Sequence, residues 1–332
     1  MKNLLITGGT GFFGRALLRH LNFEQSNSEK PFFSKVTVLS RSPQYFRQRF
    51  PELAELTWIS WHKGDILVPD SLPKNEKYHY ILHAGTSVAE CADMSSLQVF
   101  REIVDGTENL LNFAVACRAE RFLLTSSGSV YGPQLPNIST ISEAQSTSAD
   151  TLNSSNAYSV AKCQAEHLCI LYRNVYGIDV VIARCFAFVG IDLPRNSHFA
   201  IGNFIRDALE RPAIVIHGDG RPFRSYMHQS DLALWLMTLL QHGTPGDAYN
   251  VGSDEVWNIL QVAQAVKNIF APHKAIVVKG ASSESNYAPN RYVPDVTKAQ
   301  SELGLKITVR LNEALLLLKE HLVSAPGRLI TR

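Results

Sequence analysis

Short apolar runs alternate with longer segments of helical periodicity along the first 185 residues. Six runs have the length of strands, and they cover residues 3–9, 35–41, 56–61, 79–85, 121–127 and 178–184. Three segments repeat apolar residues at helical spacing, namely Phe12–Leu21, Ser96–Cys117 and Tyr158–Tyr176. Strands that alternate with helices are typical of a parallel sheet covered on both faces. We therefore predict a doubly wound α/β domain of the Rossmann type over residues 1–185.

The rhythm changes after Arg184. Four helical segments then alternate with apolar runs such as "AIVIHG" and "DAYNVG", and they cover Ile201–Leu209, Asp231–Leu240, Ile259–Phe270 and Leu311–Leu322. This pattern predicts a smaller mixed α/β lobe over residues 186–332 that binds substrate, with part of the chain near 212–250 returning to the first domain. The polar stretch between Pro133 and Asn156 is too long for a simple connector, which favours a loop near a functional site.

Glycines cluster where the first apolar run meets the first helical segment. Gly8, Gly11 and Gly14 occur in "ITGGTGFFGRALL". Glycines let the chain turn tightly and approach a pyrophosphate, and the free N–H groups at a helix start supply hydrogen-bond donors. Because the loop lies between a strand and a helix, we interpret it as a dinucleotide-binding loop rather than an ordinary turn. The further predicted cofactor contacts are Thr10 and Phe12 in this loop and Ala84 after the fourth run.

The second apolar run ends in Ser40 and Arg41 rather than in an acidic residue. A carboxylate at this place holds the ribose hydroxyls of NAD, whereas an arginine accommodates the 2′-phosphate of NADP. Because Ser40 offers no carboxylate and a guanidinium suits phosphate oxygens, we predict NADP as the cofactor, with NAD as the alternative. The other interpretation makes Arg41 an exposed turn residue before Pro43.

Hydroxyl groups mark a candidate catalytic site. The fifth apolar run ends in "LLTSSGSVYG", which contains Ser127, and Tyr158 and Lys162 follow in "NAYSVAKCQAEH". Tyr158 and Lys162 are four residues apart, so on a helix they share one face. An ammonium group beside a phenol favours the phenolate, which makes the phenol a usable acid or base near neutral pH. A surface tyrosine with a solvated lysine would show the same spacing, but it would not explain the glycine loop and the hydroxyl-ended strand.

Charge and cysteine content narrow the class of partner. The 32 basic and 30 acidic residues are spread without long blocks and give a formal net charge of +2, so we expect neither nucleic acid nor an anionic membrane as a partner. No segment reaches transmembrane length and the first apolar stretch is too short for a signal sequence, which predicts a cytoplasmic protein. The five cysteines form no CxxC pair and the eleven histidines form no HExxH motif, so we predict reduced thiols and no metal site.

These motifs together resemble the extended short-chain dehydrogenases that act on nucleotide-sugars, such as UDP-galactose 4-epimerase and dTDP-glucose 4,6-dehydratase. The resemblance covers nearly the whole chain. It rests on "TGGTGFFG", "GDI", "TSSGSVYG", "YSVAK", "GDGRPFRSYMHQSDLA" and "YNVGS". By this likeness Ser127, Tyr158 and Lys162 match the catalytic triad of the family. The likeness also implies a homodimer, in which Ser96–Cys117 and Tyr158–Tyr176 of each subunit pack into a four-helix interface.

The same resemblance implies further binding residues. Asp65 and Ile66 match the pair that lies beside the adenine of the cofactor. Arg224 lies where the family's arginine grips the diphosphate of the sugar nucleotide, and Arg291 in "NRYVPD" resembles a second diphosphate arginine. The guanidinium fork suits phosphate oxygens, although a surface salt bridge would also account for either arginine.

Departures from the family pattern bear on the reaction. Gly128 and Ser129 stand where the 4,6-dehydratases of the family carry an Asp-Glu pair. Sugar-acid decarboxylases of the family also keep a carboxylate at the second of these positions. Both reactions are therefore disfavoured. Ala187 in "RCFAFVG" replaces an asparagine that contacts substrate in many relatives, and "IVDGT" with Asp105 replaces the common "NVxGT", so the substrate pose is open.

The residues and the resemblance together predict an NADP(H)-dependent oxidoreductase that reduces a keto-hexose of a nucleotide-sugar. A 4-epimerase is the alternative, because it needs the same three residues and a sugar that can turn over. A 4,6-dehydratase, or a sensor that binds a dinucleotide without turnover, fits the sequence less well. A sensor would have little use for Ser127, Tyr158 and Lys162.

Overall fold

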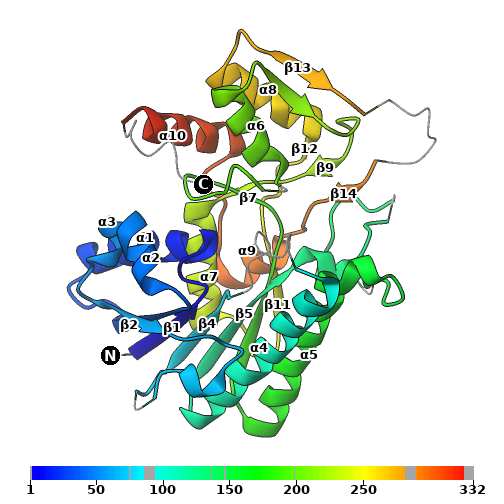
Figure 1. Cartoon of the computed structure of the whole chain (residues 1–332). Coiled ribbons are helices and arrows are strands. Elements are labelled where there is room, and N and C mark those ends of the chain that lie inside the picture. The colour runs from blue at the N-terminus through cyan, green and yellow to red at the C-terminus, as the bar shows by residue number, and fades with distance from the viewer. Residues whose placement is uncertain are drawn as a thin grey trace.

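A seven-stranded sheet forms the base of the molecule. The computed structural model describes residues 2–74, 76–85, 94–135, 137–145, 147–197, 199–280 and 289–324. The strands are β1 (Lys2–Thr7), β2 (Phe33–Ser40), β3 (Ile59–Lys63), β4 (Tyr80–His83), β5 (Arg121–Ser127), β6 (Asp179–Cys185) and β11 (Ala248–Val251). They are ordered β11-β6-β5-β4-β1-β2-β3, and every pair is parallel. This is the predicted doubly wound α/β fold (Figure 1).

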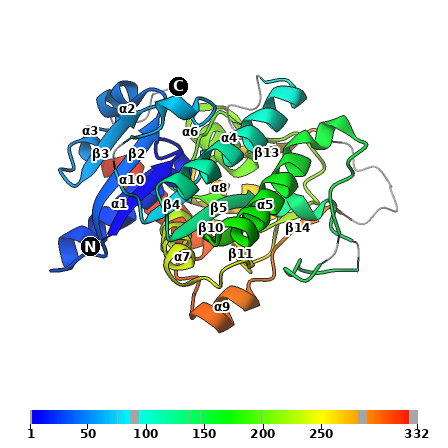
Figure 2. The same ribbon diagram turned by 90° about the horizontal axis from the view of Figure 1, so that it is seen from below.

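Helices cover both faces of this sheet (Figure 2). One face carries α4 (Ser96–Ala116) beside α5 (Ala157–Tyr176), and the other carries α1 (Phe12–Asn27) beside α7 (Gln229–His242). Strand β1 shows why both faces must be covered. Leu4 and Ile6 are buried in the core under α1 and α7, whereas Leu5 is buried in the core under α4. Successive side chains of a strand point to opposite faces, so an unbroken apolar strand requires a helical layer on each side.

A second group of elements lies above the carboxyl ends of the strands (Figure 1). Its helices are α6 (Ala200–Glu210), α8 (Ile259–Phe270) and α10 (Leu311–Ser324). Its strands are β7 (Phe188–Val189), β8 (Ala213–Ile216), β9 (Phe223–Arg224), β10 (Met227–His228), β12 (Trp257–Asn258), β13 (Ala275–Val278) and β14 (Arg291–Tyr292). These strands pair as β10-β7, β13-β8 and β12-β9-β14, and apolar residues of the three helices form a separate core.

The chain crosses between the two groups more than once. Strand β11 pairs in parallel with β6 at one edge of the large sheet, although more than sixty residues separate the two strands. Helix α7 packs against α1 and buries Trp235 completely in the core between these helices and the sheet. The Trp235 indole also donates a hydrogen bond of 3.0 Å to the carbonyl of Lys306. These contacts hold the upper elements over the ends of the strands.

Several elements differ from the expectations of the sequence. The third strand begins at Ile59 rather than near Leu56, because α3 (Pro51–Ala54) is followed by a turn before the strand starts. Helix α2 (Pro43–Arg49) and α3 each begin with a proline, which is tolerated in the first helical turn but resembles a turn signal in sequence. Helix α9 (Thr297–Leu303) was also not expected from the sequence.

The described part of the polar stretch from Pro133 to Asn156 contains little regular structure. It includes a 3₁₀ turn at Ser154–Asn156 and an isolated bridge between Ile141 and Pro294. Elsewhere in the described part of the chain, short 3₁₀ turns cover Pro69–Ser71 and Gly128–Tyr131. The bridge ties this stretch to the segment that precedes α9.

Four of the five cysteines lie in the described part of the chain. Cys117, Cys163, Cys169 and Cys185 are free thiols, whereas Cys91 lies outside the described residues, as does the end of the predicted second lobe, 325–332. None of the helices in the described part of the chain combines the length and the apolar character needed to cross a lipid bilayer.

Candidate functional site

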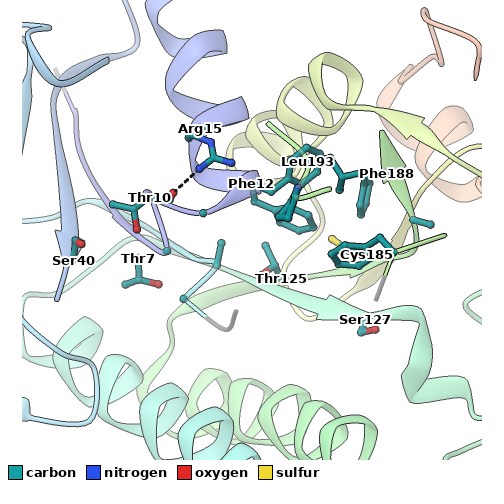
Figure 3. Close-up of a pocket in the computed structure, with 18 of the residues that line it drawn as sticks. Thr7, Thr10, Phe12, Arg15, Ser40, Thr125, Ser127, Cys185, Phe188 and Leu193 are labelled. Carbon is teal, nitrogen blue, oxygen red and sulfur yellow. Dashed lines mark hydrogen bonds between the residues drawn. The ribbon is translucent and has the colours of Figure 1, made fainter. Parts of the chain in front are cut away.

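One large cavity, about 870 Å³ in volume, lies between the carboxyl ends of the strands and the upper group of elements. Figure 3 shows Ser40 at one end of it and Ser127 at the other. The predicted site residues that line this cavity are Gly8, Thr10, Gly11, Phe12, Ser40, Arg41, Asp65, Ile66, Ala84, Ser127, Tyr158, Lys162 and Arg224. Gly14 and Arg291 do not line it. Ligands of open α/β sheets bind at this edge, where the strands end and the chain reverses direction.

The glycine loop closes tightly against the neighbouring strand. Gly8 has a φ of +69°, and a Cβ atom on it would lie 2.0 Å from the carbonyl oxygen of Ala84. A Cβ atom on Gly14 would lie 2.2 Å from backbone atoms of Gly9, so Gly14 lets α1 approach the loop and does not itself face the cavity. The loop therefore presents bare backbone at the start of a sixteen-residue helix. This is the arrangement that a pyrophosphate requires, and the residues fit a dinucleotide.

Three segments surround the end of the cavity near β2. The Oγ atom of Ser40 accepts a hydrogen bond of 3.2 Å from the backbone of Ser42. The Arg41 side chain is 56% exposed, and one of its nitrogens lies 3.8 Å from a carboxylate oxygen of Glu102 on α4. Both Arg41 and Glu102 line the cavity. A carboxylate is therefore present beside the end of β2, but it comes from a different part of the chain.

The "GDI" segment after β3 forms another wall of the same end. The Asp65 side chain accepts a hydrogen bond of 2.9 Å from the backbone of Leu67, and Ile66 packs against α4 at Gly106. A Cβ atom on Gly106 would lie 2.6 Å from the Cδ1 atom of Ile66, so a larger residue at this position would force the Ile66 side chain to move. The amide of Asn109 donates a hydrogen bond of 3.0 Å to the carbonyl of Ile66 and locks the segment onto α4.

Ser127, Tyr158 and Lys162 meet at the other end of the cavity. Ser127 ends β5, and its Oγ atom accepts a hydrogen bond of 3.1 Å from the backbone of Ser129. Lys162 is 3% exposed, and its Nζ atom donates a hydrogen bond of 2.9 Å to the carbonyl of Thr125. The same Nζ atom lies 5.9 Å from the centre of the Tyr158 ring. The three groups of the predicted triad therefore face one space.

A buried ion pair holds the helix that carries two of these groups. Tyr158, Lys162 and Glu166 are spaced by four residues on α5, so they share the face directed at the sheet. Glu166 pairs with Arg184 on β6 at 2.7 Å, and this contact raises the pKa of Arg184. Breaking one partner of a buried pair leaves an uncompensated charge, so the pair restrains the position of α5 on the strands.

His83 lies close enough to Lys162 to feel its charge, and its environment keeps it uncharged. It is buried between Thr7, at 2.7 Å from Nδ1, and Thr107, at 3.3 Å from Nε2. Burial, together with the charge of Lys162, lowers the pKa of His83 to about 3. His83 is therefore neutral at physiological pH and is not a general acid of this site.

The small sheet β12-β9-β14 decides which of its arginines faces the cavity. Arg224 on β9 is opposite Tyr292 on β14, and both line the cavity. Arg291 lies on the other face, where its guanidinium stacks on Phe223 at 4.4 Å from the ring centre and its Nε atom donates to the carbonyl of Ser139. Neighbouring residues of a strand point to opposite faces, so Arg291 and Tyr292 cannot both face the cavity.

Tyr292 was not expected from the sequence as a site residue. Its hydroxyl lies 3.5 Å from the Oγ atom of Ser127 and 3.4 Å from the carbonyl of Cys185. Burial of this hydroxyl raises the pKa of Tyr292 to about 12, so it stays protonated and can donate. The sequence signal for Tyr292 was its position next to Arg291 in "NRYVPD". Neighbouring residues of a strand point to opposite faces, so only one of the two can face the cavity.

Arg224 is a half-buried cation on the wall of the cavity. Its guanidinium lies 5.9 Å from the centre of the Tyr292 ring and donates a hydrogen bond of 2.7 Å to the carbonyl of Phe223. Burial lowers the pKa of Arg224, and no carboxylate of the described residues forms an ion pair with it. An anion bound in the cavity would supply the missing negative charge.

A parallel sheet with a glycine loop at one end of the cavity and a Ser-Tyr-Lys site at the other defines a dinucleotide-binding protein of the extended short-chain dehydrogenase type. Residues 4–252 match the model of the NAD dependent epimerase/dehydratase family, and the chain belongs to this family.

Known proteins with several different activities are similar to this chain in sequence or in fold. UDP-glucuronic acid decarboxylase 1 of Danio rerio is 28% identical over 316 residues, which are 95% of this chain and 71% of the relative. A crystal structure of UDP-glucose 4-epimerase from Thermotoga maritima with UDP-glucose matches with a TM-score of 0.80 and 19% identity over 98% of this chain and all of the other. A crystal structure of a dTDP-glucose 4,6-dehydratase from Streptomyces venezuelae with NAD bound matches with a TM-score of 0.79 and 21% identity over 98% of each chain.

Proposed function

We propose that this protein is a nucleotide-sugar oxidoreductase that reduces the carbonyl group of a keto-hexose with NADP(H). The observation that carries the proposal is the content of one cavity, which contains Ser127, Tyr158, Lys162 and Arg224. The first three supply the proton and the polarising contacts of carbonyl reduction. Arg224 supplies a charge for the diphosphate that distinguishes a nucleotide-sugar from a simple sugar.

The roles of the side chains follow from their positions. A reduced nicotinamide held in the cavity would supply the hydride for the carbonyl carbon. Tyr158 would donate the proton that converts the carbonyl oxygen into a hydroxyl. The hydroxyl of Ser127 donates a hydrogen bond to the same oxygen. Lys162 contributes positive charge beside the phenol, which favours the phenolate left after proton transfer. Tyr292 holds Ser127 in position.

The carboxylates that line the cavity argue against elimination of water and against decarboxylation. Among the described residues that line it, these are Asp65 and Glu102, and both lie at the end near β2 and β3. Ser127 ends β5, and Tyr158 lies on α5 one turn before Lys162, which donates a hydrogen bond to Thr125 of β5. In the sheet, β4 and β1 separate β5 from β2 and β3. Ser129 stands where the 4,6-dehydratases and the sugar-acid decarboxylases resembled by this sequence have a carboxylate. Its hydroxyl is buried, and the residue does not line the cavity. Among the residues that the structure describes, the reacting end thus offers no carboxylate as the additional acid or base that elimination needs.

A 4-epimerase is the second candidate. It uses the same Ser127, Tyr158 and Lys162 and returns its hydride to the sugar, so it also needs no further carboxylate. The Glu102 carboxylate beside the end of β2 favours this candidate, because it places an acceptor near the ribose of an NAD-type cofactor.

A panel of nucleotide-sugars and their 4-keto derivatives tests the proposal. The full-length protein is incubated with NADPH and each compound in turn. With one keto-sugar we expect NADPH and keto-sugar to be consumed in equal amounts. Absorbance measures the reduced cofactor, and mass spectrometry measures the product. An isomeric product without net consumption of cofactor would support the epimerase. A product lighter by water or by carbon dioxide would contradict both candidates.

The cofactor preference has its own test. The double variant Ser40→Asp/Arg41→Asn is expected to bind NAD better than NADP, because it removes the cation for the 2′-phosphate and adds a carboxylate for the ribose hydroxyls. Each change contributes about 1 to 3 kcal/mol, so the ratio of the two dissociation constants should change by roughly tenfold or more. Calorimetry with both cofactors on both proteins measures it. A natural chain that already binds NAD better would contradict the NADP proposal and favour the epimerase.

The division of the chain and its assembly are further proposals. Residues 1–185 would bind the cofactor and 186–332 the substrate, with 212–250 returning to the first domain. A homodimer through α4 and α5 is supported by apolar side chains exposed on these helices, which include Leu97, Leu171 and Val175. Analytical ultracentrifugation at micromolar concentration is expected to show twice the mass of 36.9 kDa. A compact monomer would contradict this interface.

A further inference from the structure

Glu102 lies closer to the cofactor end of the cavity than its position in the sequence suggests. It belongs to α4, more than sixty residues after Arg41, yet one of its carboxylate oxygens lies 3.8 Å from an Arg41 nitrogen. Its side chain is only 15% exposed, whereas that of Arg41 is 56% exposed. The carboxylate is therefore held at the wall of the cavity rather than in open solvent.

The surrounding contacts fix the place of this carboxylate. Glu102, Gly106 and Asn109 share one face of α4, because they are spaced by four and three residues. Gly106 and Asn109 both contact Ile66, through close packing and through a hydrogen bond of 3.0 Å. Ile66 itself lines the cavity. The face that carries Glu102 is thus docked on the segment that encloses the cofactor end, which restrains the direction of the side chain.

We propose that Glu102 determines how strongly the protein discriminates between NAD and NADP, by opposing the 2′-phosphate. The proposal rests on the proposed function only in that the cavity binds a nicotinamide dinucleotide. A 2′-phosphate held by Arg41 would lie within a few ångströms of the Glu102 carboxylate, so like charges would repel. The neutral ribose hydroxyls of NAD meet no such repulsion and can donate a hydrogen bond to the carboxylate.

The role is one of selectivity rather than of stability. An ion pair with an exposed partner such as Arg41 contributes little to the free energy of unfolding, because solvent screens it. The effect on a bound phosphate is different, because the phosphate adds two negative charges next to a carboxylate that is mostly shielded from water. Replacing the carboxylate with an amide removes the repulsion and leaves the Arg41 guanidinium to the phosphate.

The variant Glu102→Gln tests the proposal, with Glu108→Gln as the matched control. Glu108 lies on the same helix, is exposed and does not line the cavity, so the two variants change the net charge equally. Calorimetric titration of the full-length proteins with NAD+ and with NADP+ gives both dissociation constants. In Glu102→Gln the ratio of the NADP+ constant to the NAD+ constant is expected to fall about tenfold, mainly through tighter NADP+ binding.

The outcomes separate this proposal from the proposed function. A fall of the ratio in Glu102→Gln, with a change of less than about twofold in Glu108→Gln, supports the role of Glu102 whichever cofactor the natural protein prefers. An unchanged ratio in Glu102→Gln, or equal changes in both variants, overturns it and leaves the catalytic proposal intact. A natural protein that binds neither dinucleotide overturns both. Thermal unfolding of each variant shows that the comparison is made on folded protein.

Discussion

The variant Tyr158→Phe is expected to lower turnover by about 10² to 10⁴-fold, the usual contribution of a positioned general acid. The substitution removes only the phenolic oxygen, and it keeps the ring that lies 5.9 Å from the Lys162 ammonium. Burial keeps His83 neutral, and no carboxylate among the described residues lines this end of the cavity to replace the lost proton donor. Single-turnover kinetics with the substrate found in the panel measures the loss in the chemical step.

The matched control for this variant is Tyr176→Phe. Tyr176 ends the same helix, is 55% exposed and does not line the cavity, so its hydroxyl has no part in the proposed reaction. Cofactor binding, measured by calorimetry, should be retained in both variants. Near-normal turnover in Tyr158→Phe would remove Tyr158 from the catalytic role and the oxidoreductase proposal with it.

The variant Arg224→Ala is expected to weaken nucleotide-sugar binding by roughly 30- to 150-fold, which corresponds to about 2 to 3 kcal/mol for charge-assisted hydrogen bonds. The reason is the environment of this guanidinium. It is half-buried on the cavity wall, and no carboxylate of the described residues forms an ion pair with it, so a diphosphate would be its main counter-charge. Titration with UDP and with dTDP measures the loss without knowledge of the sugar.

Two further variants make the Arg224 result specific. Arg221→Ala removes a nearby arginine that pairs with Asp219 and does not line the cavity, and it should leave the affinity for UDP and dTDP unchanged. Arg224→Lys keeps the charge but loses the fork, so its affinity should lie between those of the natural protein and of Arg224→Ala. Unchanged affinity in Arg224→Ala, together with a retained fold, would assign Arg224 to a structural role.

The succession of strands and helices along the chain was predictable, because the signal for each element lies within its own segment. An unbroken apolar strand such as "NLLIT", a glycine loop before a helix and a tyrosine four residues before a lysine are local patterns. Each requires only the chain geometry of one element. The cavity-lining positions of Gly8, Ser127, Tyr158 and Lys162 follow from these patterns, because the carboxyl ends of parallel strands share one edge.

The contacts between distant segments decided which other side chains reach the cavity. Arg291 and Tyr292 are neighbours in sequence, but the register of β14 against β9 places Tyr292 beside Arg224 and turns Arg291 to the other face. The end of β2 carries no carboxylate in sequence, yet the docking of α4 on the "GDI" segment brings Glu102 to Arg41. No local pattern contains these contacts, because each depends on which face of an element is buried against a segment far away in the chain.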